Sequence, residues 1–209
     1  MRTRGITNLD RRYEVVKDRL IIVDKTITRE ELIGNYRHLY AEFGMGKGKF
    51  IREMAKRNQK DMYIGIDKYL DILVQASEKL ETENVKILKM DLSSIREYMH
   101  ENMFDGLFLN FSDPWPKNKH YKRRLTYRSF LDLYDFVVRD GAEIAFKTDN
   151  SKLFAFTLEE LFATNRVAYD ITLDLHNDSR YVENIKTEYE EKFEKQGPIY
   201  GLKWKAKNK

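Results

Sequence analysis

Apolar and polar positions follow two different rhythms along most of the chain. Short continuous apolar runs are typical of buried strands, and apolar residues three and four positions apart are typical of amphipathic helices. The expected strands are His38–Phe43, Met62–Ile66, Val85–Met90, Gly106–Phe111 and Glu143–Lys147. The expected helices are Gly48–Arg57, Leu70–Glu81, Ser93–Glu101 and Thr126–Val138. This alternation predicts an α/β fold, with a parallel sheet, right-handed crossovers and helices on both faces.

The rhythm changes after one more helical segment, Ser151–Phe162. Two strand-like runs, Val167–Leu175 and Ile199–Lys205, are joined by the polar segment His176–Gly197. Because no helix of ordinary length is needed between them, we expect an antiparallel pair at the edge of the sheet.

The first 35 residues are polar and basic with weak periodicity, although Leu20–Val23 is an apolar run of strand length. We interpret residues 1–35 as a basic N-terminal arm that can be flexible, and residues 36–209 as a single domain.

Composition excludes several classes of protein. The 209 residues include no cysteine, which rules out a disulfide scaffold, thiolate metal sites and a cysteine nucleophile. No apolar run is long enough for a membrane span, and the polar start lacks the core of a signal peptide. We therefore expect a soluble, cytoplasmic protein with no membrane partner.

The net charge of +4 is modest, but the basic residues are clustered. No acidic residue lies between Asp113 and Asp132. That stretch contains Lys117, Lys119, His120, Lys122, Arg123, Arg124 and Arg128. Such a cluster suits a polyanion such as nucleic acid, and the alternative is an ordinary solvated face.

A glycine-rich loop follows the first strand of the expected domain. Glu42 stands two positions before Gly44, which is followed by Gly46 and Gly48. The spacing differs from the Gly-x-Gly-x-x-Gly of dinucleotide folds, and no Gly-Lys-Ser/Thr follows, so a P-loop is excluded. A carboxylate here repels phosphate and attracts ammonium or sulfonium. The alternative is a plain strand-to-helix turn.

Acidic residues also follow the next two strands. Asp67 comes after the second, where nucleotide-binding folds hold ribose hydroxyls, and Asp91 comes after the third, where it can receive an adenine amino group. Each has the alternative role of a helix N-cap, and for Asp91 alone the cap is favoured. Together with Glu42, they predict a ligand site at the carboxyl edge of the sheet.

The fourth strand runs into Asp113, followed by Trp115 between two prolines. Proline fixes φ and removes a backbone donor, so a stiff loop is expected. A rigid loop with an aromatic side chain suits a planar base, and the alternative is a structural turn with Trp115 packed on the core.

These motifs resemble the bacterial tRNA (guanine-N7)-methyltransferase family. The segments that carry the resemblance are Glu42–Gly48, Ser112–Lys117, Lys119–Leu125, Phe146–Asn150 and Thr187–Phe193. The resemblance implies a Rossmann-like class I methyltransferase that uses S-adenosylmethionine, with a mostly parallel seven-stranded sheet, helices on both faces and an antiparallel edge pair. The implied product is 7-methylguanine in the tRNA variable loop, usually at position 46.

The resemblance also implies roles for individual residues. The cofactor-binding set is Glu42, Gly44, Gly46, Gly48, Asp67, Asp91 and Asp113, and Asp113 is also catalytic. The substrate-binding set is Lys117, Asp149, Thr187, Glu188, Tyr189 and Glu190. The RNA-contacting set is Lys119, His120, Tyr121, Lys122, Arg123 and Arg124. The partner is tRNA, no metal is expected, and the protein is a monomer or a homodimer. Asp67 stands where many members have Glu.

The chemistry is consistent with these residue types. Guanine N7 carries a lone pair and no proton, so methyl transfer needs alignment and carboxylates that stabilise a cationic product. Asp149 or Glu190 can accept from the guanine N1–H and amino group, although a helix cap and a surface acid are their ordinary roles. Two other functions remain open: an adenine amino-methyltransferase, and a non-catalytic tRNA-binding protein on the same scaffold.

Overall fold

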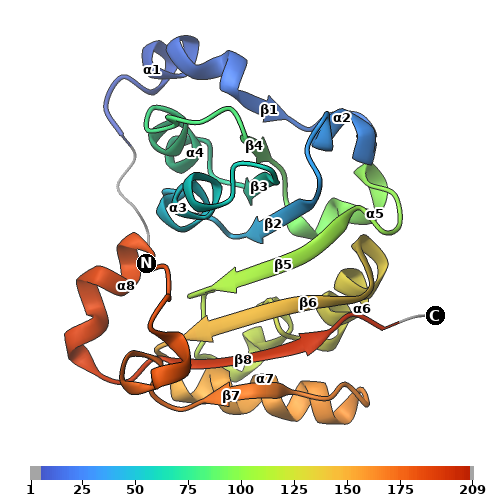
Figure 1. Cartoon of the computed structure of the whole chain (residues 1–209), viewed down its shortest axis with the longest axis vertical. Coiled ribbons are helices and arrows are strands. Elements are labelled where there is room, and N and C mark those ends of the chain that lie inside the picture. Colours follow the sequence, from blue (N-terminus) through green and yellow to red (C-terminus); the bar gives the residue numbers. More distant parts are fainter. Residues whose placement is uncertain (1–5, 208–209) are drawn as a thin grey trace.

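A single eight-stranded sheet runs through the computed structural model, which describes residues 6–207 (Figure 1). The strand order is β1-β4-β3-β2-β5-β6-β8-β7. The strands are β1 (Leu20–Ile22), β2 (Leu39–Phe43), β3 (Met62–Asp67), β4 (Val85–Lys89), β5 (Phe104–Asn110), β6 (Val138–Thr148), β7 (Tyr169–Thr172) and β8 (Tyr200–Lys205). All strands from β1 to β6 pair in parallel, which confirms the predicted α/β fold.

Helices cover both faces of this sheet because each buries one apolar stripe against it. One core contains side chains of α1 (Leu9–Val16), α3 (Lys49–Arg57) and α4 (Leu70–Ser77). The other contains side chains of α2 (Arg29–Ile33), α5 (Ile95–Tyr98), α6 (Arg128–Val137) and α7 (Ser151–Ala163). The short helix α8 (Glu188–Phe193) lies where the arrowheads of β2, β5 and β6 point (Figure 1).

The predicted antiparallel edge is confirmed. Strand β8 pairs antiparallel with β6 on one side and with β7 on the other. Strand β6 begins earlier than expected, at Val138, directly after α6. Two predicted helices are shorter in the structure: α4 ends at Ser77, and α5 is a single turn preceded by a 3₁₀ turn at Leu92–Ser94.

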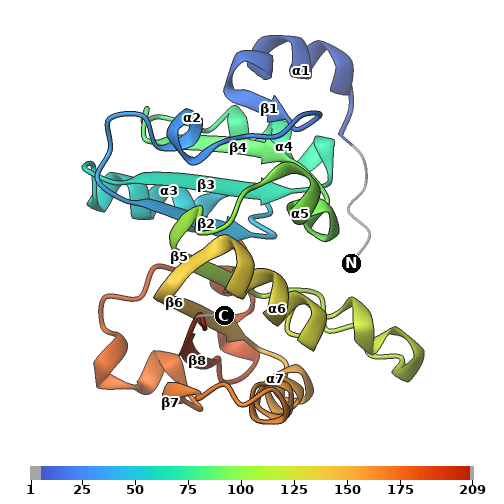
Figure 2. The same ribbon diagram turned by 90° about the vertical axis from the view of Figure 1, so that its right-hand side faces the viewer.

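The sheet has eight strands where seven were expected, because the described part of the expected N-terminal arm contributes one. Strand β1 pairs in parallel with β4, and Figure 2 shows α1 and β1 at the opposite end of the sheet from β7. Val16, Leu20 and Leu32 are buried. The apolar run Leu20–Val23 was the signal for this strand.

Within the described residues, no helix is both long enough and apolar enough to span a bilayer.

Candidate active site

Four carboxylates predicted from the sequence lie at or just after the carboxyl ends of four neighbouring parallel strands. Glu42 lies in β2, Asp67 ends β3, Asp91 follows β4 and Asp113 follows β5. In the sheet these strands are adjacent in the order β4-β3-β2-β5. Because their carboxyl ends meet at one edge, the topology brings the carboxylates to the same side of the molecule.

The glycine loop is built so that its backbone lies open at this edge. Gly46 and Gly48 have φ of 56° and 72°, a region that disfavours side chains. Gly44 has the same left-handed conformation, and its amide donates to the Ile66 carbonyl at 2.8 Å. A Cβ on Gly48 would lie 2.5 Å from the end of the Met45 side chain, so Met45 packs closely against the loop at Gly48.

Asp67 fixes the loop from the neighbouring strand. Its Oδ2 accepts from the Gly46 amide at 3.3 Å, and its Oδ1 accepts from the amides of Lys68 and Tyr69 at 2.7 and 3.2 Å. Burial raises the pKa of this carboxyl although three amides favour the charged form. Asp67 therefore joins the end of β3 to the loop after β2.

Glu42 is a buried acid with one unused oxygen. Its side chain is 1% exposed, and Oε1 accepts from Asn110 Nδ2 at 2.8 Å. Oε2 is buried and has no hydrogen-bond partner among residues 6–207. Burial raises the pKa of Glu42 to about 8, against the opposing effects of Asn110 and the Lys147 charge. A buried polar atom left unpaired is costly, so this oxygen marks a place for a cationic or hydrogen-donating ligand.

Asp91 serves as the cap that was its favoured alternative. Its Oδ1 accepts from the Ser93 amide at 3.0 Å and from the Ser93 hydroxyl at 2.7 Å, and these bonds lower its pKa. Its Oδ2 lies 4.0 Å from Lys68 Nζ at a half-exposed position. One carboxylate oxygen therefore holds the start of the 3₁₀ turn, and the other faces toward the surface.

The loop after β5 is strained and is clamped by an arginine. Phe111 and Trp115 have φ of 52° and 41°, which is unusual for bulky side chains. Arg124 Nε donates to the Pro114 carbonyl at 3.0 Å, and its Nη2 donates to the Trp115 carbonyl at 3.3 Å. The same guanidinium stacks 4.4 Å from the Phe156 ring centre. Arg124 thus holds the loop, a role that the sequence analysis did not assign.

The basic cluster lies directly beside this loop, mostly in the 3₁₀ segment Asn118–Arg123. Lys117, Lys119 and Lys122 are exposed, and within residues 6–207 none of them forms an ion pair with an acid. Arg123 lies 5.0 Å over the Trp115 ring. The Trp115 ring also meets His120 edge-on at 5.7 Å. Cations without acidic partners are suited to phosphate groups.

Helix α8 is held to the sheet by a buried lysine that the sequence analysis missed. Lys147 Nζ donates to Glu190 Oε2 at 2.6 Å, to the Ile185 carbonyl at 2.7 Å and to Asn184 Oδ1 at 3.1 Å. The side chains of Lys147 and Glu190 are 6% and 0% exposed. Burial lowers the pKa of Lys147, whereas the charge of Lys147 lowers the pKa of Glu190 despite its burial. A lysine directly after the apolar run Ile144–Phe146 was the available signal.

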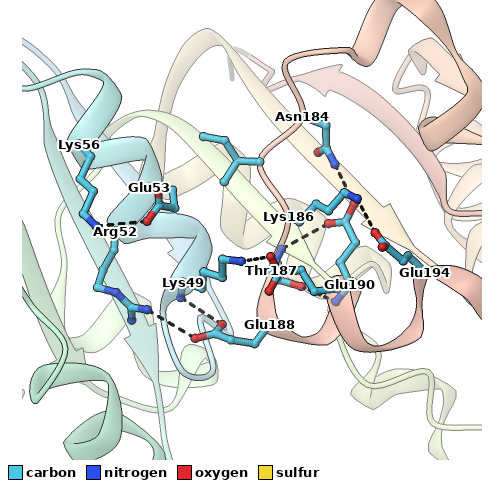
Figure 3. A network of polar contacts seen from close by, with 12 residues as sticks. Lys49, Arg52, Glu53, Lys56, Asn184, Lys186, Thr187, Glu188, Glu190 and Glu194 are labelled. Atoms are coloured by element: carbon cyan, nitrogen blue, oxygen red, sulfur yellow. Dashed lines mark hydrogen bonds and ion pairs between the residues drawn. The ribbon is translucent and has the colours of Figure 1, made fainter.

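Glu190 is therefore not a surface acid. Besides Lys147, it accepts from Asn184 at 2.7 Å and contacts His176 Nε2 at 2.7 Å. Thr187 and Glu190 also form a capping box, in which each side chain accepts from the backbone amide of the other. These contacts, drawn in part in Figure 3, direct the carboxylate into the protein.

The other predicted substrate residues of α8 lie in two different places. The Tyr189 hydroxyl donates to Asp149 Oδ2 at 2.8 Å, and its ring lies 5.2 Å from that of Phe111, beside the loop after β5. Glu188 instead lies against the N-terminus of α3, where its Oε2 accepts from the Lys49 amide at 3.1 Å. The structure therefore brings Asp149 and Tyr189 together and places Glu188 beside the glycine loop.

Two further features of the described residues bear on ligands. Asn110 and Lys147 help to line a cavity of about 130 Å³, together with Phe50, Phe108, Leu175 and Tyr181. Within residues 6–207, no group of three or more His, Asp or Glu side chains is arranged to hold a metal ion.

Comparison with known proteins places the chain among methyltransferases. A family model described as "Putative methyltransferase" matches residues 36–201. A tRNA (guanine-N(7)-)-methyltransferase of Lachnoclostridium phytofermentans is 48% identical over 82% of this chain and 82% of its own length. That of Geobacillus sp. is 46% identical over 80% of this chain and 77% of its own length.

Solved structures agree on the fold. The antibiotic-resistance methyltransferase Kmr covers 90% of this chain and 98% of its own, with a TM-score of 0.62 and 15% identity. A 16S rRNA (adenine(1408)-N(1))-methyltransferase mutant from Catenulisporales acidiphilia, solved with its cosubstrate SAM, covers 83% of this chain and 88% of its own, with a TM-score of 0.55 and 12% identity. At these identities the likeness shows the fold alone.

Proposed function

Because this chain belongs to the tRNA (guanine-N7)-methyltransferase family, we propose that it transfers a methyl group from S-adenosylmethionine to N7 of a guanine in tRNA. The product is 7-methylguanine, and position 46 of the variable loop is the expected target. The rest of the proposal assigns roles to the residues at the carboxyl edge of the sheet.

The proposal for the cofactor rests on Oε2 of Glu42, which is buried and has no hydrogen-bond partner in the described part of the chain. A buried carboxylate that lacks a counterion fits an ammonium or sulfonium group, and S-adenosylmethionine has both. This cofactor supplies an electrophilic methyl group and leaves as S-adenosylhomocysteine. Gly44, Gly46 and Gly48 allow it to approach the backbone closely, and Asp67 is placed for the ribose hydroxyls. The outer oxygen of Asp91 is assigned to the adenine amino group. No metal has a part in the proposal.

Asp113 and Asp149 are proposed to act on the guanine. N7 attacks the methyl group with its own lone pair, so no residue has to remove a proton from it. Methylation makes the ring cationic, and carboxylates beside it stabilise that charge. Asp149 and Tyr189 already share a hydrogen bond, and Thr187 holds the start of the helix that carries Tyr189. Glu190, held inward by Lys147, acts by positioning α8.

The tRNA backbone is proposed to bind to the basic cluster beside the Trp115 loop. Lys117 follows Asp113 by four positions and is assigned to the substrate nucleotide. The assigned phosphate-binding residues are Lys119, His120, Tyr121, Lys122 and Arg123. Contacts of this kind position RNA without reading its bases.

The decisive experiment is incubation with labelled S-adenosylmethionine and bulk tRNA, followed by nucleoside analysis. Label in 7-methylguanosine is expected. Label in a methylated adenosine would show an amino-methyltransferase instead. If tRNA binds and no label is transferred, the protein is a non-catalytic tRNA-binding protein, and the proposal is wrong.

A further inference from the structure

Glu188 connects two regions that are far apart in the sequence. It is the first residue of α8, and its Oε2 accepts from the backbone amide of Lys49, the first residue of α3. Its Oε1 lies 3.6 Å from the Arg52 guanidinium. Figure 3 shows Glu188 directed from α8 toward both residues.

The Lys49 amide and the Arg52 guanidinium, which Glu188 contacts, form an anion-binding site. We call this site the seat. The first amides of a helix have no partner within the helix and carry a partial positive charge. Gly48, the N-cap of α3, has no side chain to satisfy them. Arg52 adds a full positive charge, and its Nη1 is fixed to the Lys47 carbonyl of the glycine loop at 2.7 Å. The seat therefore lies at the point where the loop becomes the helix.

Glu188 does not fill this seat completely. Its Oε1 is buried and forms no hydrogen bond with any residue that the structure describes. The negative charge of Glu188 also helps to raise the pKa of Glu42, although desolvation by burial is the main cause. A ligand that presents a carboxylate to Arg52 and an ammonium to Glu42 would fill the seat and at the same time pair the buried Oε2 of Glu42.

We propose that the cofactor's carboxylate binds in the seat, and that Glu188 occupies the seat in the ligand-free protein. We call Glu188 in this position the latch. The inference rests on the proposed use of S-adenosylmethionine, which carries a carboxylate and an ammonium at one end. When this end binds, Glu188 leaves the Lys49 amide, and the first turn of α8 is released. Because that turn also carries Tyr189, cofactor binding prepares α8 for the guanine and favours the order cofactor first, tRNA second.

The test compares two nucleosides that differ in this group. S-adenosylhomocysteine has the carboxylate, whereas 5′-methylthioadenosine lacks the whole amino-acid part. Glu188→Ala frees the seat, so calorimetry should show about five- to tenfold tighter binding of S-adenosylhomocysteine, because the binding-competent fraction increases. The affinity for 5′-methylthioadenosine should stay the same. A ligand role for Glu188 would produce weaker S-adenosylhomocysteine binding, which overturns the latch.

Glu191→Gln is the matched control. Glu191 pairs with the side chain of Lys49 from the same helix, but it does not contact the backbone amide. Its replacement should change the affinity for S-adenosylhomocysteine by less than about twofold, and an equal gain would mean that α8 docking in general, not the seat, limits binding. If the wild-type protein binds neither nucleoside, the cofactor assignment itself fails, whereas binding without the Glu188 effect rejects only the latch.

Discussion

At the scale of single residues, burial changes what the Glu42 carboxyl group can do. Its pKa is raised from 4.5 to about 8, mainly by desolvation. The unfolded chain ionises this group near its ordinary pKa, so between the two values the folded state holds more protons than the unfolded state. The free energy of unfolding therefore falls as pH rises through this window, and a cation that pairs with Glu42 reverses the loss.

We expect S-adenosylmethionine to release close to one proton from Glu42 at pH 7, because the cation favours the ionised carboxylate. Below pH 8 its affinity should rise by up to about tenfold per pH unit, and above pH 8 it should level off. Calorimetry in buffers of different ionisation enthalpy measures the proton. Glu42→Gln should bind more weakly and release none. Wild-type binding without proton release would contradict the pairing.

Asp113 presents the complementary case of an exposed acid in a rigid loop. Within residues 6–207 its side chain has no hydrogen-bond partner, and Arg124 holds the loop without it. Asp113→Asn should therefore fold normally and lose about 10²–10³ in turnover through the missing charge, and Asp113→Ala should lose more. Single-turnover methylation at saturating substrates measures this. An Asn variant within about threefold of wild type, or roughly 0.7 kcal/mol, would leave Asp113 as a turn residue only.

At the scale of elements, α8 is fixed by a buried ion pair more than by its own length. A helix of six residues has little stability alone, so its place depends on the contacts of Glu190 with Lys147 and its neighbours. Breaking such a pair leaves one charge buried without a partner.

Lys147→Met should lower the free energy of unfolding by about 3–5 kcal/mol, or release α8 from the sheet at a similar cost. Urea unfolding measures the first outcome, and hydrogen exchange across residues 184–194 measures the second. Lys147→Met combined with Glu190→Leu should recover much of the loss, because no buried charge remains. Unchanged stability together with unchanged exchange in the single variant would show that the pair does not hold the helix.

Variants in the loop after β5 and variants in the basic segment that follows it should differ in the salt dependence of tRNA binding. Lys122→Ala should weaken tRNA binding and reduce its salt slope by about 0.7–0.9, the effect of one lost phosphate contact. Arg124→Ala should leave the slope unchanged and lower turnover, because Arg124 binds the carbonyls of Pro114 and Trp115. Filter binding across a salt series distinguishes them. A reduced slope in the Arg124 variant would place Arg124 on the RNA.

At the scale of the whole molecule, the described part of the N-terminal segment, from residue 6 onward, is part of the folded body. Strand β1 extends the sheet beside β4, and Arg12 of α1 pairs with Glu78 after α4 at 2.5 Å. An exposed pair contributes little, so the buried apolar side chains of this segment should provide most of its stability.

Two neighbouring valines of α1 test this packing. Val16 is 3% exposed and Val15 is 79% exposed. Val16→Ala should lower the free energy of unfolding by about 2 kcal/mol, while Val15→Ala should change it by less than about 0.5 kcal/mol. Both are measured by urea unfolding of the full chain. Equal midpoints for the two variants would show that the segment does not contribute to the cooperative core.

The sequence by itself determined the features that depend on neighbouring residues. Apolar periodicity located the strands and helices between His38 and Ala163, because burial imposes a period on consecutive positions. The glycine loop was readable because left-handed φ values need glycine at particular positions. The motifs around Asp113 and Thr187 carried the resemblance to the family because each lies within one short segment of the chain.

Tertiary structure alone decided which distant groups meet. In the sequence, Lys147 is an ordinary lysine. In the fold its charge is buried and pairs with Glu190, 43 positions later in the chain. Arg124 belongs to a basic cluster in the sequence, yet folding directs its guanidinium to the carbonyls of the loop. Glu188 reaches the Lys49 amide across 139 positions. Local patterns carry no information on such pairings, because the energy of a buried charge depends on the partners that the whole fold brings to it.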